Sequence, residues 1–341
     1  MASEAPPFWW EKSDWRAALL WPISKIYARA AVHRMDNAKP ATINLPVMCI
    51  GNLTVGGGGK TPTAIAIAQA AMKLKLKPGI VSRGYGGVTK GVHLVDPHHD
   101  LAKHVGDEPL LISNYAPIVV SVDRLAGAKK LQELGCDFII MDDGFQSMRL
   151  KSDFNLVVID ARRGIGNGHV IPGGPLRAPV VPQLRHADAV LKTGNGEAAD
   201  PIVRLAARAA KPIHIAKPVV AKGINLKNKR VLAFAGIADP DKFFDTLTSI
   251  GAFISLARTW PDHHYFADDE LGELYQTAEA GDLILVTTEK DAMRLARGSE
   301  TACRVLEKAI TLRIDMTFDQ TDVPRRMIEQ TLENFRRRQI G

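Results

Sequence analysis

The sequence has 341 residues, of which 46% are apolar and 24% are charged, with a net charge of +7 and a pI near 9.3. This length is sufficient for two α/β domains with separate hydrophobic cores. Apolar runs stay below the ~18 residues of a membrane span, and no secretory signal is expected. Three widely spaced cysteines argue against a zinc site or a disulfide framework. The positive charge favours anionic partners such as nucleotides, nucleic acids or acidic membranes.

The N-terminal stretch, residues 1–35, is predicted to contain an amphipathic helix with four of the five tryptophans close to its start. After Ser13, a suitable N-cap, apolar residues recur at helical spacing. They are Trp15, Ala18, Leu19, Ile23, Ile26, Tyr27 and Ala30. Pro22 is expected to kink or divide this helix. Tryptophans with interleaved Lys and Arg favour contact with an anionic membrane. The alternative is a helix that packs on the protein's own core.

Residues 51–61 read Gly-Asn-Leu-Thr-Val-Gly-Gly-Gly-Gly-Lys-Thr, between an apolar run and a helical stretch. This order is typical of a P-loop, in which backbone N–H groups and a helix N-terminus bind phosphate. Thr54 stands where the usual pattern has its first glycine. The alternative is a flexible glycine turn. The predicted nucleotide-binding residues are Thr54, Val55, Gly56, Gly57, Gly58, Gly59, Lys60 and Thr61.

Three later segments carry charged residues at strand or helix ends. Arg83 follows a short strand, where an arginine can hold a phosphate or remain solvated. Asp107 and Glu108 begin a helix, where ordinary capping is the favoured interpretation and a catalytic base is the alternative. Asp142 and Asp143 end an apolar strand downstream of the P-loop, an arrangement that predicts a magnesium-binding Walker B motif.

Alternating strands and helices predict an α/β fold with a P-loop NTPase-like, doubly wound, mostly parallel sheet. The long loop within residues 162–177 is rich in Gly, Pro and Arg, and loops of this length are usually functional or disordered. We place the P-loop kinase domain at residues 36–222, with the N-terminal membrane-associating helix (residues 1–35) as part of it, and a smaller α/β domain at 223–341. In the smaller domain, the Asp262-His263-His264 loop is suited to proton chemistry. The Thr288-Glu289-Lys290-Asp291 run lacks the spacing of a guanine motif.

Seven blocks follow one another along the chain, at residues 51–62, 81–87, 106–109, 142–146, 173–177, 262–263 and 288–292. In this order they resemble the tetraacyldisaccharide 4′-kinase family, the lipid A 4′-kinases of Gram-negative bacteria. The resemblance covers nearly the whole chain, and the Thr54 departure is shared with that family. Two positions differ from the family's usual pattern: Ser147 stands where His is frequent, and Ala178 where Glu is frequent.

The resemblance implies transfer of the ATP γ-phosphate to the 4′-hydroxyl of a tetraacylated glucosamine disaccharide 1-phosphate, giving lipid IV-A. It implies Asp107 as catalytic base, with His263 as its proton relay. It also implies binding of Mg²⁺ by Thr61, Asp142 and Asp143. The implied substrate contacts are Arg83, Glu108, Gln146 and Arg177. The implied location is the cytoplasmic face of the inner membrane, as a peripheral protein bound to the anionic surface.

Two other classes of function remain open from the residues themselves. One is a P-loop kinase of another soluble or lipid-linked sugar, and a soluble substrate would not need the N-terminal membrane helix. The other is a GTPase-like nucleotide switch, which would carry a guanine motif. A nucleic-acid ATPase is disfavoured, because aromatic residues are scarce away from the N-terminus. We therefore expect no nucleic-acid partner.

Overall fold

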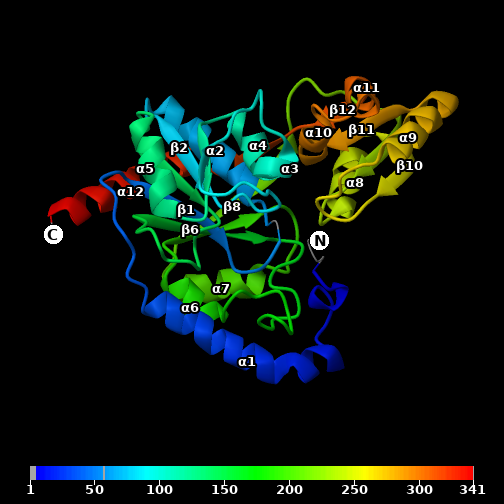
Figure 1. Cartoon of the computed structure of the whole chain (residues 1–341). Coiled ribbons are helices and arrows are strands. Elements are labelled where there is room, and N and C mark those ends of the chain that lie inside the picture. Colours follow the sequence, from blue (N-terminus) through cyan, green and yellow to red (C-terminus); the bar gives the residue numbers. More distant parts are fainter. Residues whose placement is uncertain (1–4, 57, 341) are drawn as a thin grey trace.

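A computed structural model describes residues 5–56 and 58–340, which form two α/β units (Figure 1). The strands of the larger unit are β1 Val47–Asn52, β2 Pro78–Ser82, β3 Val92–Leu94, β4 Ile118–Ser121, β5 Phe138–Asp142, β6 Phe154–Asp160, β7 Ala189–Thr193, β8 Ile213–Val220 and β13 Ile314–Phe318. They form one sheet in the order β13-β8-β7-β6-β1-β5-β2-β4-β3. Its central pairs are parallel and only the two edge pairs, β3–β4 and β13–β8, are antiparallel. The predicted doubly wound, mostly parallel sheet is confirmed.

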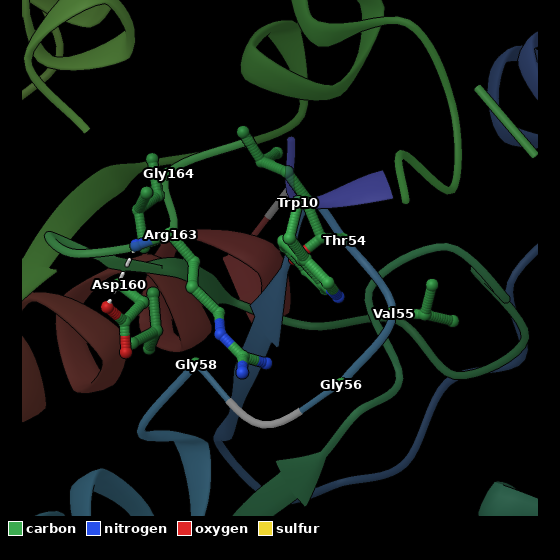
Figure 2. A pocket seen from close by; sticks show the side chains of 11 residues that line it. Trp10, Thr54, Val55, Gly56, Gly58, Asp160, Arg163 and Gly164 are labelled. Carbon is green, nitrogen blue, oxygen red and sulfur yellow. Dashed lines mark hydrogen bonds between the residues drawn. The ribbon is translucent and has the colours of Figure 1, made fainter. Parts of the chain in front are cut away.

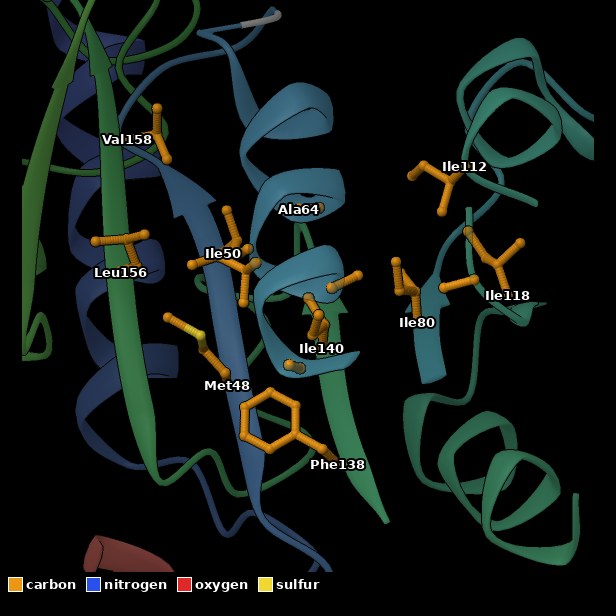
Figure 3. Packing of buried hydrophobic residues seen from close by; sticks show 14 of the residues in the cluster. Met48, Ile50, Ala64, Ile80, Ile112, Ile118, Phe138, Ile140, Leu156 and Val158 are labelled. Carbon is orange, nitrogen blue, oxygen red and sulfur yellow. The ribbon is translucent and has the colours of Figure 1, made fainter. Parts of the chain in front are cut away.

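Helices cover both faces of this sheet. They are α1 Trp15–Asp36, α2 Lys60–Lys73, α3 Ala102–Val105, α4 Asp107–Ser113, α5 Arg124–Glu133, α6 Val180–Arg185, α7 Asp200–Arg208 and α12 Val323–Ile340, after a short 3-10 turn, η1 Pro7–Trp9. Along β1, Met48 and Ile50 pack towards α2 and α12, whereas Val47 and Cys49 pack towards α1 and α5. This alternation follows from the period of two in a strand. Figure 3 shows the hydrophobic core on the α2 side of the sheet, which includes Ile80 and Ile140.

The smaller unit has its own parallel sheet and two hydrophobic clusters. Its strands are β9 Arg230–Ala235, β10 Phe253–Thr259, β11 Ile284–Thr288 and β12 Ile310–Leu312, and its helices are α8 Pro240–Ser249, α9 Asp268–Gly281, α10 Glu289–Leu295 and α11 Glu300–Lys308. The strand order is β10-β9-β11-β12. A smaller α/β unit after the P-loop domain is therefore present, as expected.

The predicted end of the smaller domain at residue 341 is wrong. Strand β13 leaves the small sheet and pairs antiparallel with β8 of the large sheet. Helix α12 then places Val323, Met327 and Ile328 in the large core, against α2. These apolar side chains are buried on the larger unit, so the chain from 314 to 340 belongs to it.

Helix α1 runs without a break from Trp15 to Asp36, so Pro22 lies inside it and does not divide it. The N-cap is Asp14, not Ser13, because the Asp14 carboxylate accepts hydrogen bonds from the N–H groups of Arg16 and Ala17. Within the described residues, no helix combines the length and the apolar character that a bilayer crossing requires.

The two faces of α1 have opposite roles. Small residues on one face are buried on the protein: Ala17, Ser24, Ala28 and Ala31, followed by Met35. The large apolar residues on the other face are exposed, namely Trp15 (72%), Leu19 (71%), Ile23 (56%) and Ile26 (68%). We call these four the apolar stripe. The apolar stripe is therefore not buried in the protein's own core, whereas Met35, at the end of the helix, is.

Candidate active site

The loop between β1 and α2 has the conformation of a phosphate-binding loop at the carboxyl edge of the sheet. Gly56 (φ +92°) and Gly59 (φ +88°) adopt left-handed backbone that favours glycine. Helix α2 begins at Lys60, so the free N–H groups of its first turn face the loop. Gly57 lies outside the described residues. The predicted strand, glycine loop and helix are therefore confirmed as local structure.

A second segment, residues 175–177, holds this loop from outside. The Val55 N–H donates to the Pro175 carbonyl at 2.9 Å, and Arg177 Nε donates to the Thr54 carbonyl at 3.0 Å. Thr54 forms an antiparallel bridge with Leu176 and is not among the residues with positive φ. A threonine therefore fits where a left-handed glycine would otherwise be needed.

A pocket adjoins the loop on the other side (Figure 2), lined by Thr54, Val55, Gly56 and Gly58 together with Trp10, Asp160 and Arg163. The Arg163 guanidinium lies 5.0 Å from the centre of the Trp10 ring, a cation–π distance. Arg163 also pairs with Asp239 of the smaller domain at 3.1 Å. The N-terminal segment, the loop and the smaller domain therefore meet at this arginine.

Lys60 lies between the loop and Asp143, the residue that follows β5. Its Nζ donates to the Gly56 carbonyl at 3.3 Å and lies 3.9 Å from Asp143 Oδ1. Asp143 Oδ2 accepts a bond from Arg177 at 2.8 Å. Burial tends to raise the pKa of the Asp143 carboxyl, but the charges of Lys60 and Arg177 bring it below its usual range.

Asp142 and Asp143 present oxygens suited to a magnesium ion. Asp142 Oδ2 accepts a bond from Ser82 at 3.2 Å, but Asp142 Oδ1 and Asp143 Oδ1 are buried without a hydrogen-bond partner among the described residues. Burial raises the pKa of Asp142 to about 7, and nearby Glu108 and Asp143 add to the rise. Buried carboxylate oxygens that lack a hydrogen-bond partner among the described residues fit a hard divalent cation.

Asp107 and His263 come together from different domains. Asp107 begins α4 and is 3% exposed, and His263 follows β10 in the smaller domain. His263 Nδ1 lies 3.1 Å from Asp107 Oδ2, so the imidazole donates to the carboxylate. This hydrogen bond raises the pKa of His263 above its usual value, although burial opposes the rise. The sequence placed both residues in candidate loops, and the structure brings them into contact.

Helix α10 contributes two cations to this pair. Arg294 donates to Asp107 Oδ2 through Nε (3.0 Å) and Nη2 (2.6 Å), and Lys290 forms an ion pair with Glu108. Arg294 was not among the residues predicted from the sequence, and Lys290 was considered for a guanine motif and as part of the 288–292 block of the family resemblance, without a role of its own. The available signal was the spacing of four residues between the two cations, which places them on one helix face.

The whole chain was compared with known proteins. A family model described as tetraacyldisaccharide-1-P 4′-kinase matches residues 16–333. The chain belongs to this family. It is 52% identical to the tetraacyldisaccharide 4′-kinase of Mesorhizobium japonicum, over 100% of this chain and 99% of that one. It is 50% identical to the enzyme of that name from Brucella ovis, over the full length of both. The chain is therefore an ATP-dependent kinase.

The fold agrees with that assignment. The crystal structure described as the "apo" form of LpxK from Aquifex aeolicus in complex with ATP superposes with a TM-score of 0.71. The two chains are 25% identical, and the superposition covers 92% of this kinase and 99% of that protein. The P-loop NTPase-like architecture predicted from the sequence is thus shared with a solved member of the family.

The four predicted substrate residues occupy different environments in this kinase. Arg83 is exposed after β2, and Glu108 is paired with Lys290. Gln146 donates to the Asn52 carbonyl at 2.6 Å and lies 3.4 Å from Arg177 Nη1. Its amide is therefore occupied in supporting the P-loop and Arg177, whereas Arg83 is open to a ligand.

The two departures from the family pattern have structural roles here. Ser147 Oγ donates to the Gly144 carbonyl at 2.8 Å and closes the turn after the aspartates. Ala178 is fully buried, and its carbonyl accepts a bond from Gln183 at 2.6 Å. Neither side chain replaces the charged group that is frequent at its position.

Proposed function

We propose that this kinase transfers the γ-phosphate of ATP to the 4′-hydroxyl of a tetraacylated glucosamine disaccharide 1-phosphate, yielding lipid IV-A in lipid A biosynthesis. The observation that carries the chemistry is the Asp107–His263 pair beside a P-loop. A sugar hydroxyl is a weak acid, so a positioned proton acceptor lowers the barrier to its attack. The name of the family indicates the phosphoryl acceptor, a tetraacyldisaccharide 1-phosphate. The P-loop is the expected binding site of ATP, the phosphoryl donor.

The proton of the 4′-hydroxyl passes to the Asp107–His263 pair. Asp107 Oδ2 already accepts three donors, from His263 and from two nitrogens of Arg294, and Oδ1 accepts the Glu108 N–H at 2.9 Å. His263 is more accessible, with 17% of its side chain exposed against 2% for Asp107. Within the described residues Nε2 of His263 makes no hydrogen bond, and the nearby Asp262 Oδ2 lies 3.6 Å away. Nε2 is therefore the acceptor in this proposal, and Asp107 fixes the ring and stabilises the imidazolium.

The transferred phosphoryl group needs positive charge rather than a covalent partner. Lys60 and the N–H groups at the start of α2 face the position of the β- and γ-phosphates. Thr61, Asp142 and Asp143 would hold Mg²⁺, which when bound offsets the negative charge of the phosphate oxygens. Arg177 donates hydrogen bonds to Asp143 and to the Thr54 carbonyl. In this proposal it would contact the lipid acceptor at the same edge of the sheet.

The apolar stripe of α1 is proposed to insert into the anionic cytoplasmic face of the inner membrane. Its four large apolar residues project from the protein, and exposed Lys25 and Arg29 lie beside them. Such a face binds by burying apolar area and by attraction to anionic headgroups. Because α1 packs on the 164–177 loop through the Ser24–Gly173 hydrogen bond, the membrane would lie near Arg177.

The deciding experiment measures ³²P transfer from labelled ATP to the disaccharide lipid presented in mixed micelles. Soluble glucosamine phosphates and an acyl-free disaccharide serve as controls. Transfer to the 4′ position of the disaccharide lipid, without transfer to the soluble controls, supports the proposal. Equal transfer to the soluble sugars would instead support a kinase of another sugar.

A further inference from the structure

A buried arginine of the smaller domain contacts Asp107 of the proposed Asp107–His263 pair and also bonds to Gly236, whose carbonyl accepts the His263 N–H. We propose that Arg294 is a positioning residue for the Asp107–His263 pair: it fixes the carboxylate in one domain and the loop of the imidazole in the other. This inference rests on the proposed function of that pair. It adds to that pair a third residue, which determines the orientation of both side chains.

The contacts of Arg294 define this role. Its side chain is 1% exposed, and each of its three nitrogens has a protein acceptor. Nε and Nη2 donate to Asp107 Oδ2, while Nη1 donates to Asp291 Oδ1 and to the Gly236 carbonyl, both at 2.7 Å. A planar guanidinium held at every nitrogen has little freedom to rotate. The Asp107 carboxylate is therefore held in a single orientation.

Arg294 also reaches the other member of the pair through Gly236. The Gly236 carbonyl accepts the His263 N–H at 3.2 Å, and the Gly236 N–H donates to Asp291 at 3.1 Å. The Arg294–Asp291 unit thus holds the end of β9, against which the His263 loop is fixed. One side chain therefore positions the carboxylate directly and the imidazole indirectly.

The charges around the pair give this geometry an electrostatic consequence. Burial by itself would raise the pKa of Asp107. The hydrogen bond from His263 and the positive charges of Lys290 and Arg294 hold this pKa well below its usual range. Around His263, Asp107 and Asp262 raise the imidazole pKa, whereas Lys290 lowers it. The remaining charges of the cluster, Asp291 and Glu108, are paired with Arg294 and Lys290 respectively.

The sign of the effect on pH dependence follows from these charges. Removal of the arginine charge leaves the Asp107 carboxylate with less positive compensation. An imidazolium beside this carboxylate then becomes more stable, so the His263 pKa rises further. The proton acceptor is consequently blocked up to a higher pH. On the acidic side of the pH profile, kcat should therefore fall at a higher pH than in the wild type. We call this fall the acidic limb. A residue that only held the two domains together would not move it.

The test compares Arg294→Gln and Arg294→Lys with a matched control, Arg258→Gln, which removes a surface arginine paired with Glu273 in the same domain. Arg294→Gln is expected to lower kcat by about 10- to 100-fold with little change in KM, and to shift the acidic limb upward. Arg294→Lys should keep the limb in place but lower kcat about 10-fold. Arg258→Gln should match the wild type. Circular dichroism and thermal melting check folding.

Two outcomes would overturn the inference. One is a wild-type kcat in Arg294→Gln. The other is a kcat that is lowered by the same factor at every pH, so that the acidic limb stays at the wild-type pH. If Arg294→Gln does not fold, Arg294→Lys decides, because wild-type kcat there excludes the role. The double variant Asp107→Asn/Arg294→Gln should be no slower than Asp107→Asn alone, since the arginine acts through that carboxylate. Wild-type activity of Asp107→Asn would refute the proposed pair itself, a result distinct from failure of Arg294 alone.

Discussion

Lys60 Nζ lies 3.9 Å from Asp143 Oδ1 and donates to the carbonyl of Gly56, so the P-loop lysine is neutralised within the protein. Asp143 is itself held by Arg177 at 2.8 Å. A triphosphate would compete with these internal acceptors for the lysine. The lysine is thereby kept next to the carboxylates that we propose bind the metal, before nucleotide binds, because a buried ammonium needs a partner.

Lys60→Met is expected to lower kcat by about 10²-fold or more, because it removes the side-chain cation that offsets the charge of the transferring phosphoryl group. Steady-state rates at saturating ATP and Mg²⁺ provide the measurement. Lys73→Met, at the exposed end of α2, is the control and should retain wild-type rates. Similar rates in both variants would contradict the role of Lys60.

Asp107→Asn and His263→Gln should each lower kcat by about 10²- to 10⁴-fold, the usual contribution of a general base. In the wild type, activity should fall on the acidic side with an apparent pKa above the ordinary value of histidine. The direction follows because Asp107 raises the His263 pKa, and a protonated imidazole cannot accept a proton. His263→Gln should lose this acidic limb. A limb retained in that variant would point to another titrating group.

Asp142→Asn should raise thermal stability at pH 8 in the absence of Mg²⁺. The pKa of Asp142 in the folded protein is about 7, above the ordinary 3.8 of an unfolded aspartate. The stability that protonated Asp142 contributes is fully present at pH below its pKa in the unfolded chain. It is lost as the pH rises through its pKa in the folded protein. Asparagine removes this loss, so Tm should rise by about 2–4 °C for each kcal/mol regained.

The matching measurement for Asp142 is a melting series from pH 5 to pH 8 with and without Mg²⁺. The difference in Tm between variant and wild type should grow with pH when the metal is absent. Mg²⁺ should stabilise the wild type and not Asp142→Asn. Parallel Tm curves, or equal stabilisation by Mg²⁺, would count against Asp142 as a metal-binding carboxylate.

Replacement of Leu19 and Ile26 by Glu should reduce sedimentation with vesicles that contain anionic lipid. Both side chains project from α1, with 71% and 68% exposure, so the folded structure should tolerate the change. Phe253→Glu, at a 68%-exposed position in the smaller domain, is the matched control. Equal loss of binding in the control, or none in the α1 variant, would place the membrane contact elsewhere.

Gly51→Ala should destabilise the protein by about 1–3 kcal/mol, because the added methyl would lie 2.4 Å from Cβ of Phe145. Gly272→Ala in α9 is the control: its methyl meets nothing within 4 Å, so helix propensity should add about 0.5–1 kcal/mol. Denaturant unfolding of both variants measures the two changes. A neutral Gly51→Ala would show that the strand and the Gly144–Phe145 turn can separate at no cost.

Local patterns in the sequence correctly predicted several elements of this kinase. The glycine loop before Lys60 is phosphate-binding in form because strand, loop and helix are adjacent in the chain. The aspartates at the end of β5 were predicted in the same way, since the carboxyl ends of parallel strands meet at one edge. The periodic apolar residues of α1 indicated a helix. For the loop and the helix the information lies within about 15 residues of the feature. For the aspartates, the strand is local, but the interpretation also used the P-loop earlier in the chain.

Tertiary packing determined what those patterns left open. It turned the apolar stripe outward, since the small residues of α1 allow its other face to pack closely on the protein. It also returned β13 and α12 to the larger domain, because their apolar side chains are buried there. It brought Arg294 to Asp107 across 187 positions of sequence. Periodicity reports only which residues share a face, whereas contacts between distant elements depend on how whole surfaces fit together and which buried charges find partners.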